Sequence, residues 1–313
     1  MLSRTADNLF WAARYVERAD FTARVLDAAI RLSSLPASYA GEAGEEWRSA
    51  LATSDVDEAF EATGRDPTEF EIRRYLAFDR DNSSSIVACL ERARANARAV
   101  RTALTTETWE GINDAWNELQ AFKPDMDAER FARFLEWTKR VSLAFDGSAG
   151  RTMLRNDGYW FLRLGTALER ADNTARLLDV KYHLLLPQEE PVGGSLDYFG
   201  WTTILREVSA LTAYRWVYRE EIKPWLVADL LLLNSQLPRS VASSYEVIVA
   251  GLDALGEMYG RPGPSQRLAV DILHRLEGSR MNELFQSGLH EFINQILADN
   301  ARLGSAIAEQ YLS

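Results

Sequence analysis

The sequence contains very little cysteine and histidine, and these shortages exclude several kinds of site. Cys89 is the single cysteine in 313 residues, so the chain cannot form an internal disulfide or a cysteine-based zinc site. It lies in the apolar run SIVACL, which predicts a buried core position rather than a catalytic thiol. His183, His274 and His290 do not occur in the Glu-x-x-His pattern that dimetal sites in helical bundles use. We therefore expect no metal and no other cofactor.

The chain also lacks a long apolar run, a basic charge balance and a nucleotide motif. No apolar stretch reaches the roughly 18 residues needed to span a bilayer. The opening MLSRTADNLFWAARYVER mixes acids and arginines into its apolar run, unlike a signal or transit peptide. A net charge of −11 argues against a protein that coats nucleic acid. Glycine-rich phosphate loops and Rossmann fingerprints are absent. We expect a cytoplasmic protein with no nucleic-acid or membrane partner.

One charged stretch occurs twice in the chain. ERADFTARVLD begins at Glu17 and ERADNTARLLD begins at Glu169, and nine of their eleven positions are identical. Similarity continues downstream, where Trp47 and Leu51 match Trp201 and Leu205. Further on, residues 75–86 match residues 229–241. The nearly constant offset predicts a tandem duplication, with one copy at 1–150 and the other at 151–313.

The spacing of apolar residues predicts helices throughout. The segments SIVACLERARANARAVRTAL, ERFARFLEWTKRVSLAF and LHEFINQILADNARLGSAIAEQYL carry apolar residues three and four positions apart, and alternating strand patterns are absent. The first helix could be capped by Asp7 or Asn8 and could continue to Pro36. We predict an all-α fold of roughly ten to fourteen helices, built as one bundle from two repeats related by a pseudo-twofold axis.

The two copies of the repeated stretch should place charged residues in one narrow seam of a mostly apolar helix. On a helical wheel one sector of the first copy holds acids and bases in alternation, and the same sector recurs in the second copy. The members of this seam are Glu17, Asp20, Arg24, Asp27 and Arg31, and then Glu169, Asp172, Arg176, Asp179 and His183. Because most of the remaining circumference is apolar, both helices should be largely buried.

Three interpretations of the seam are open. In the structural one, the two helices cross and Glu17 pairs with Arg176 while Glu169 pairs with Arg24. In the second, the seam lines an internal cleft for a charged ligand, and in the third it faces water. Arg18 and Arg170 point to a different, apolar side, where an unpaired charge would be costly. Their partners should therefore come from other helices.

Three further features are candidates for binding. His290 lies beside Glu291 at the predicted start of a C-terminal helix, where it could be packed, capping or catalytic. Arg239 follows Pro238 at another predicted helix start and could hold an anion or form a salt bridge. Arg94, Arg98 and Arg101 share one helix face, which could meet an acidic partner or a phosphate, or could simply be solvated.

The motifs together resemble one family. MLSRTADNLFWAARYVERADFTARVLD is similar to the opening of the bacterial alpha-E proteins, and RNDGYWFLRLGTALERADNTARLLD to their second signature. ARANARAVR, TTETWEGIN, LPRSV and GLHEF follow in the family's order, so the resemblance covers essentially the whole chain. Asp20 stands where the family usually has glutamate, and Ala95 stands where glutamate is frequent.

The resemblance implies a setting rather than a reaction. Alpha-E proteins are typically encoded beside, or fused to, circularly permuted ATP-grasp proteins, often with transglutaminase-like proteins nearby. ATP-grasp enzymes activate a carboxylate as an acyl phosphate and capture it with an amine, so the implied system makes or modifies peptides. The family supplies no catalytic assignments. Its motif positions here are candidates of importance only: Glu17, Arg18, Arg24, Glu169, Arg170, Arg176, Arg239 and His290.

Three functions follow from these observations. The first is an accessory helical partner of an ATP-grasp amide ligase, docked through the arginine face or the seam. The second is an enzyme acting on a charged peptide-like intermediate, in which burial raises the pKa of Glu17 or Glu169 toward neutrality for general-base catalysis. Arginines would then hold substrate carboxylates in bidentate pairs. The third is a pure scaffold, in which every charge in the seam is paired and no cavity adjoins it.

Overall fold

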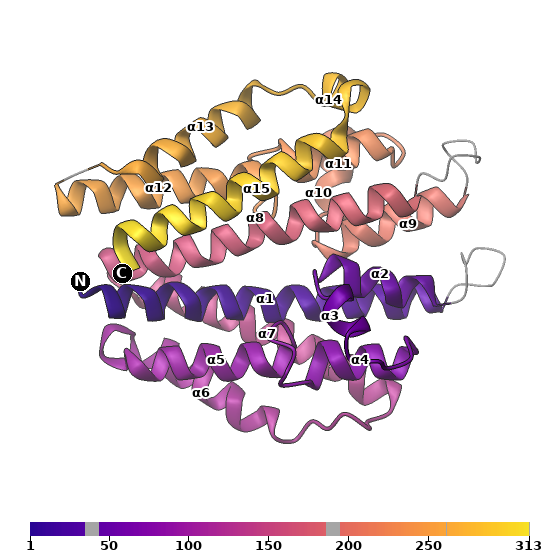
Figure 1. Cartoon of the computed structure of the whole chain (residues 1–313), viewed down its shortest axis with the longest axis horizontal. Coiled ribbons are helices and arrows are strands. Elements are labelled where there is room, and N and C mark those ends of the chain that lie inside the picture. The colour runs from indigo at the N-terminus through magenta and orange to yellow at the C-terminus, as the bar shows by residue number, and fades with distance from the viewer. Residues whose placement is uncertain (35–43, 186–194, 261, 313) are drawn as a thin grey trace.

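The computed structural model describes residues 1–34, 44–185, 195–260 and 262–312, and within these residues it contains fifteen α-helices and no strand (Figure 1). The all-α prediction is therefore confirmed, and the number of helices slightly exceeds the predicted range. The helices are α1 Ser3–Ser33, α2 Glu45–Thr53, α3 Asp57–Glu61, α4 Glu69–Phe78, α5 Ile86–Ala99, α6 Thr106–Leu119, α7 Ala128–Thr152, α8 Asp157–Leu185, α9 Ser195–Glu207, α10 Leu211–Tyr218, α11 Pro224–Leu232, α12 Val241–Tyr259, α13 Pro264–Gly278, α14 Met281–Ser287 and α15 Leu289–Ile307.

The two helices that carry the repeated stretch, α1 and α8, lie side by side at the centre of the molecule (Figure 1). They run in the same direction, because Leu9 approaches Gly158 while Ala13 approaches Gly165 further along both helices. A Cβ atom on Gly165 would collide with the carbonyl oxygen of Phe10, so the backbones are in close contact there. Both helices are largely buried, as their broad apolar surfaces predict.

The remaining long helices form a group on each side of this central pair. α5 and α7 pack on α1, and α6 packs against both of them. On the other side α12 and α15 pack on α8, and α13 packs against both of those. Figure 1 shows the first group in purple and magenta and the second in orange and yellow. Of the seam residues, Glu17, Asp20, Arg24 and Glu169 are therefore buried between two helical layers, whereas Arg31 at the far end of α1 is exposed.

Several buried and capping residues stabilise the helices locally. Trp47 and Trp201 are both buried, on α2 and α9 respectively. Ser85 and Ser240 cap α5 and α12, each accepting a hydrogen bond from a backbone N–H three residues on. Cys89 is fully buried, its thiol donates to the Ser83 carbonyl at 3.6 Å, and burial raises its pKa to about 12. The prediction of a core cysteine is confirmed.

The predicted start of the first helix is wrong. α1 begins at Ser3, before both proposed caps, and the Leu2 carbonyl accepts hydrogen bonds from the amides of Thr5 and Ala6. The proposed end at Pro36 lies outside the described residues. Over the part of the chain that the structure describes, no helix combines the length and the apolar character needed to cross a membrane.

Candidate functional site

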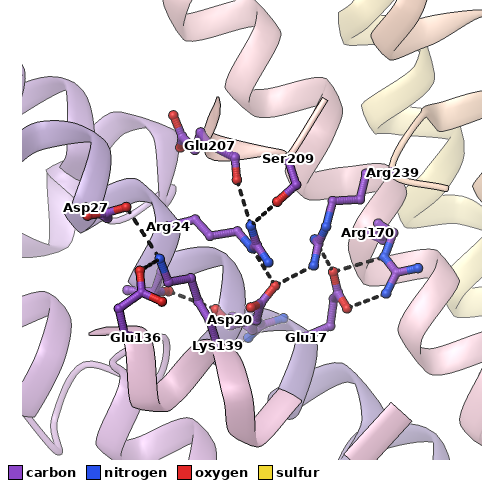
Figure 2. Close-up of polar contacts among 12 residues, drawn as sticks. Glu17, Asp20, Arg24, Asp27, Glu136, Lys139, Arg170, Glu207, Ser209 and Arg239 are labelled. Carbon is purple, nitrogen blue, oxygen red and sulfur yellow. Dashed lines mark hydrogen bonds and ion pairs between the residues drawn. The ribbon is translucent and has the colours of Figure 1, made fainter. Parts of the chain in front are cut away.

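Glu17 and Arg170 form one of two reciprocal ion pairs between the central helices. Arg170 donates from Nε to Glu17 Oε1 at 3.0 Å and from Nη2 to Oε2 at 2.8 Å (Figure 2). Arg239, from the residues before α12, adds a bond to Glu17 Oε1 at 2.9 Å. Glu17 is 2 % exposed, so two guanidinium groups compensate a carboxylate that water scarcely reaches.

Glu169 and Arg18 form the second pair, in the opposite direction. Arg18 donates from Nε to Glu169 Oε1 at 2.5 Å and from Nη2 to Oε2 at 3.1 Å. Arg14, one helical turn earlier on α1, donates to Oε2 at 2.8 Å. Glu169 is also buried. In each Glu-Arg dipeptide the glutamate is thus bound by the arginine of the dipeptide on the other helix, and the arginine binds the glutamate there.

These pairs confirm that Arg18 and Arg170 take partners from another helix, but the predicted partners of the glutamates are wrong. Neither Glu17–Arg176 nor Glu169–Arg24 forms. The physical reason is axial position: because α1 and α8 are parallel, the two dipeptides lie at the same height and face each other directly. Arg24 and Arg176 lie more than a turn further along.

Arg24 and Arg176 instead bind their own helices and reach turns in the other half of the chain. Arg24 donates to Asp20 at 2.8 Å and to the hydroxyl of Ser209 at 2.9 Å, in the turn between α9 and α10 (Figure 2). Arg176 pairs with Asp172 at 2.7 Å and with Asp55 at 3.0 Å, in the turn between α2 and α3. Each of these arginines therefore forms an ion pair with the acid four residues earlier on its own helix.

Arg239 joins the first half of the seam into a network. Besides Glu17 it binds Asp20 Oδ2 at 2.6 Å, so Asp20 shares this oxygen between Arg24 and Arg239 (Figure 2). Asp20 is fully buried. Of the two roles considered for Arg239, the structure contains the salt bridge. Nearby, Lys139 contacts both Asp27 and Glu136 at the edge of the network.

The pairing has a direct effect on acidity. Burial alone would raise the pKa of Glu17, but the charges of Arg170 and Arg239 outweigh burial and lower the pKa to about 2. Burial likewise opposes ionisation of Glu169, and Arg18 with Arg14 again lowers the pKa below its ordinary range. The hypothesis that burial raises either pKa toward neutrality is wrong, because both glutamates remain ionised near pH 7.

A cleft of about 470 Å³ adjoins the Glu169 half of the seam. Its polar lining includes Arg14, Arg18, Glu169, Asp172 and Arg176, and aromatic side chains of α1 border it. The buried glutamates of the seam are therefore paired, although not with the partners that the structural interpretation named, and Glu169 also borders a cavity, as the ligand interpretation requires.

Three residues of the cleft have a buried side-chain atom without a hydrogen-bond partner in the part of the chain that the structure describes. The atoms are Asn173 Nδ2, Thr53 Oγ1 and Ser54 Oγ. Asn173 is 7 % exposed and Thr53 is 1 % exposed. None of the three residues was predicted from the sequence. For Asn173 a signal existed, because it is one of the two positions where the repeated stretches differ, with Phe21 in the first copy.

His290 does not line the cleft, but it contacts Asp179, a later member of the seam on α8. Its Nδ1 is 2.6 Å from Asp179 Oδ1 and its Nε2 is 2.9 Å from the Asn294 side chain. Both ring nitrogens are thus engaged, which fits a packed histidine near the start of α15. The side chain of His183, which was expected in the seam, lies outside the described residues.

The arginine face of α5 is only partly available. Arg94 donates two hydrogen bonds to Asn113 Oδ1, at 3.1 and 3.0 Å, and lies over the Trp116 ring of α6. Arg98 and Arg101 are exposed and form no ion pair with any described residue. Arg101 belongs to a short 3₁₀ turn after α5 rather than to the helix itself.

Metal binding finds no support in the side-chain arrangement. Among the described residues, no three histidine, cysteine, aspartate or glutamate side chains are grouped so that they could hold an ion. The buried acids of the seam face guanidinium groups instead, and these oppose a cation.

The reciprocal Glu-Arg pairs agree with what sequence comparison finds. A sequence model for a predicted alpha-helical domain with a conserved ER motif, named Alpha-E, matches residues 1–312. The chain belongs to the Alpha-E family. In this Alpha-E protein the Glu-Arg dipeptides at 17–18 and 169–170 are the ones that pair with each other across the two central helices.

Similar proteins contain the matching segment within longer chains. An uncharacterised protein of Mycobacterium bovis and one of Mycobacterium tuberculosis are each 26 % identical to this chain over 319 residues, and a protein of a second M. tuberculosis strain is 25 % identical. Each alignment covers 94 % of this chain but 35 % of the relative. The chain therefore spans about a third of these relatives' length. No solved structure matches it significantly.

Proposed function

We propose that this Alpha-E protein is a cytoplasmic, non-catalytic binding partner of an amide-forming ligase of the circularly permuted ATP-grasp type. The system would synthesise or modify peptides, and a transglutaminase-like protein would be a further partner. The ATP chemistry would belong to the ligase, because this chain carries no nucleotide-binding motif.

The observation that carries the proposal is the state of the two buried glutamates. Each has two arginines on its carboxylate, and each has a pKa below its ordinary range. A general base at neutral pH needs a pKa near 7 and a free lone pair directed at substrate. Glu17 and Glu169 have lowered pKa values and each accepts three hydrogen bonds from arginines, so they favour a structural role over the alternative of an enzyme that uses them as bases.

The length of the relatives supports a role in association. In the mycobacterial proteins the similar segment is about a third of one polypeptide. A unit that is covalently joined to other segments works at high effective concentration beside them. We infer that the separate chain reaches the same arrangement by non-covalent binding.

We also propose that the two halves of the chain are copies of one helical unit related by a pseudo-twofold axis. The order of packing supports this, since α5 and α7 lie on α1 as α12 and α15 lie on α8. Corresponding details support it as well. Thr22 donates to the carbonyl of Ser84 at 3.3 Å, and Thr174 donates to the carbonyl of Arg239 at 2.8 Å. The copies would meet at the α1–α8 contact.

The docking surface would include Arg98 and Arg101. Both are exposed and form no ion pair with a described residue, and the chain as a whole has a net charge of −11. An acidic patch on the ligase would be attracted by such a site, mainly through a faster association rate that falls with salt.

A titration with a purified ATP-grasp protein from the same genome tests this proposal. Arg98→Glu combined with Arg101→Glu should weaken binding by at least about tenfold, since two favourable charges become repulsive. Arg267→Glu combined with Arg280→Glu is the matched control, because these arginines are also exposed but belong to the second half. Equal affinity of wild type and both variants would exclude this docking surface, and no binding by wild type would contradict the partnership.

A further inference from the structure

Ser84 and Arg239 occupy corresponding places in the two halves, but they fill space very differently. Each directly precedes the serine that caps the helix packed on α1 or α8, and each gives its carbonyl to a threonine of that central helix. Arg239 extends over the first acid pair and binds Glu17 and Asp20 (Figure 2). Ser84 is too short to do this, and it lines the cleft of about 470 Å³. The Arg239 side chain thus fills the space beside Glu17, whereas the equivalent space beside Glu169 remains a cleft.

The acceptors in the open half are already used. Both oxygens of Glu169 are bound by Arg18 and Arg14. Asp172 is bound by Arg176 at 2.7 Å and lies 3.4 Å from the side-chain amide of Asn300. A cationic ligand would therefore find few free oxygens and three arginines in its way.

Hydrogen-bond donors, in contrast, remain free toward the cleft. Arg14 is bonded through Nε alone, so its two terminal nitrogens have no partner among the described residues. Arg18 has one terminal nitrogen left, and the buried Asn173 Nδ2 has no partner. Of these donors only Asn173 Nδ2 is buried without a partner, which costs about 1–3 kcal/mol that a ligand oxygen would recover. The side chains of Arg14 and Arg18 are 17 % and 23 % exposed, so a ligand carboxylate would replace water on their terminal nitrogens.

The size and charge of the cleft restrict the chemical class of the ligand further. About 470 Å³ is within the range of small-molecule sites and exceeds what a single ion needs. Three arginines and three acids line it, so its formal charge balances, and a multiply charged phosphate would meet carboxylates as well as guanidiniums. Phe10, Trp11 and Phe21 provide apolar contact for a hydrocarbon portion.

We propose that this cleft binds a small peptide-like ligand through a carboxylate, which Arg14, Arg18 and Asn173 receive, while the aromatic side chains of α1 contact its hydrocarbon part. The hydroxyl of Thr53, which also lacks a partner, is available to an amide of the same ligand. Arg98 and Arg101 do not line the cleft, so this inference stands independently of the docking surface proposed above.

Calorimetric titration of the full chain with three probes tests the ligand class. The probes are N-acetyl-leucine, which has one carboxylate and a hydrocarbon side chain, its neutral counterpart N-acetyl-leucinamide, and inorganic phosphate. N-acetyl-leucine should bind at least about tenfold more tightly than the other two. The proposal is overturned if N-acetyl-leucine fails to bind at about 10 mM, or if the neutral compound or phosphate binds as well as it does.

Two pairs of variants test the place of binding. Asn173→Asp replaces the free donor by an acceptor at nearly constant volume and should weaken N-acetyl-leucine binding at least about tenfold. Asn117→Asp adds the same charge on the exposed side of α6 and is its control. Ala301→Trp should block the cleft, whereas Ala298→Trp lies on the same helix but does not line it.

The binding of these variants decides whether the cleft is the binding site. Loss of binding by Asn173→Asp and Ala301→Trp, with both controls unaffected, supports the site. Ala301 is exposed, so its variant keeps the test valid if Asn173→Asp fails to fold. Tighter binding by Asn173→Asp, or equal binding by Ala301→Trp and Ala298→Trp, overturns the proposal.

Discussion

Glu17 carries its charge at a place that water scarcely reaches, and three arginines make this possible. Arg170 and Arg239 bind its oxygens directly, and the charge of Arg24 acts on it through space. The arginines remain protonated at any ordinary pH, so the state of the cluster depends on its acids. Removing either member of such a buried pair strongly destabilises the fold, because the remaining charge would be left without compensation.

The low pKa of Glu17 predicts a specific loss of stability in acid. The folded pKa is about 2 and the ordinary value is 4.5, so ionisation stabilises the fold fully above about pH 4.5. This contribution, about 3 kcal/mol, disappears as the pH falls from 4.5 toward 2. Glu17→Gln should therefore lower the free energy of unfolding by about this amount at pH 7, with the gap to wild type closing in acid. Urea unfolding at several pH values measures both.

Glu136→Gln is the control for this prediction. Glu136 also pairs with a cation, Lys139, but its side chain is 59 % exposed. Its variant should differ from wild type by less than about 1 kcal/mol at every pH. A gap for Glu17→Gln that stays constant from pH 7 to about pH 2 would contradict the account of its ionisation.

At the residue scale the sequence predicts which side chains need partners better than it predicts the partners. An arginine on an apolar helix face must be compensated, and this alone predicts that Arg18 and Arg170 bind other helices. The helical wheel gives a direction around the axis but no position along it. The prediction that Glu17 pairs with Arg176 rather than Arg170 is wrong in the position along the helix axis. Asp55 and Ser209 were missed because they lie in turns, where periodicity gives no direction.

Among the helices, α1 and α8 depend on a close backbone contact as well as on their charges. Gly165 faces the Phe10 carbonyl and the side chain of Ala13, and no larger residue fits there without displacement. Alanines such as Ala12, Ala13, Ala19 and Ala23 are buried along α1, which lets neighbouring helices approach it closely. This contact places the two Glu-Arg dipeptides within hydrogen-bond distance of each other.

Gly165→Ala should consequently destabilise the protein although alanine favours helices. The new methyl group would collide with backbone, which cannot move aside as a flexible side chain can, and we expect a loss of about 2–3 kcal/mol. Gly147→Ala on α7 has open space around its Cβ and should stabilise by up to about 1 kcal/mol. Thermal unfolding of both variants measures the difference. A neutral or stabilising Gly165→Ala would mean that the helices are not in close contact.

The long helices were more predictable than their ends. Apolar spacing alone indicates α5, α7 and α15, because each carries a continuous periodic face. Asp7 and Asn8 looked like caps, yet α1 starts before them and Leu2 has no capping side chain. The brief helices α3 and α14, of 5 and 7 residues, are too short for periodicity to reveal, and they raise the total above the predicted range.

For the whole molecule, the most consequential contacts join residues from opposite halves of the sequence. The Glu17–Arg170 and Glu169–Arg18 pairs, the Arg24–Ser209 bond and the Arg176–Asp55 pair all do so. The linker between the proposed halves is short, since α7 ends at Thr152 and α8 begins at Asp157. Each half would expose a buried acid and its arginines if the other half were absent.

Fragments 1–154 and 155–313 should therefore fold poorly alone and better together. Each fragment by itself should show no cooperative thermal transition, because the partners of Glu17 and Glu169 would be missing. Mixing the two in equal amounts should restore a transition. Circular dichroism during heating measures this. Independent cooperative unfolding of either fragment would show that the halves are separate domains.

The fold class and the buried charged helices could be predicted from the sequence, but the cleft could not. The repeat, the wide apolar face of each central helix and the need of each buried charge for a partner can all be read from the sequence. The cleft depends on a difference between equivalent positions, Ser84 against Arg239 and Phe21 against Asn173, and on which side chains come to surround it. Such a space exists only after both halves are assembled.

The proposal that this Alpha-E protein binds an ATP-grasp ligase is tested most directly by affinity purification of the tagged full chain from its source organism, with mass spectrometry of the proteins that accompany it. The account predicts an ATP-grasp protein in stoichiometric amount, reduced when Arg98 and Arg101 are both changed to glutamate. Recovery of the wild-type chain alone, under mild salt and at native expression, would contradict it.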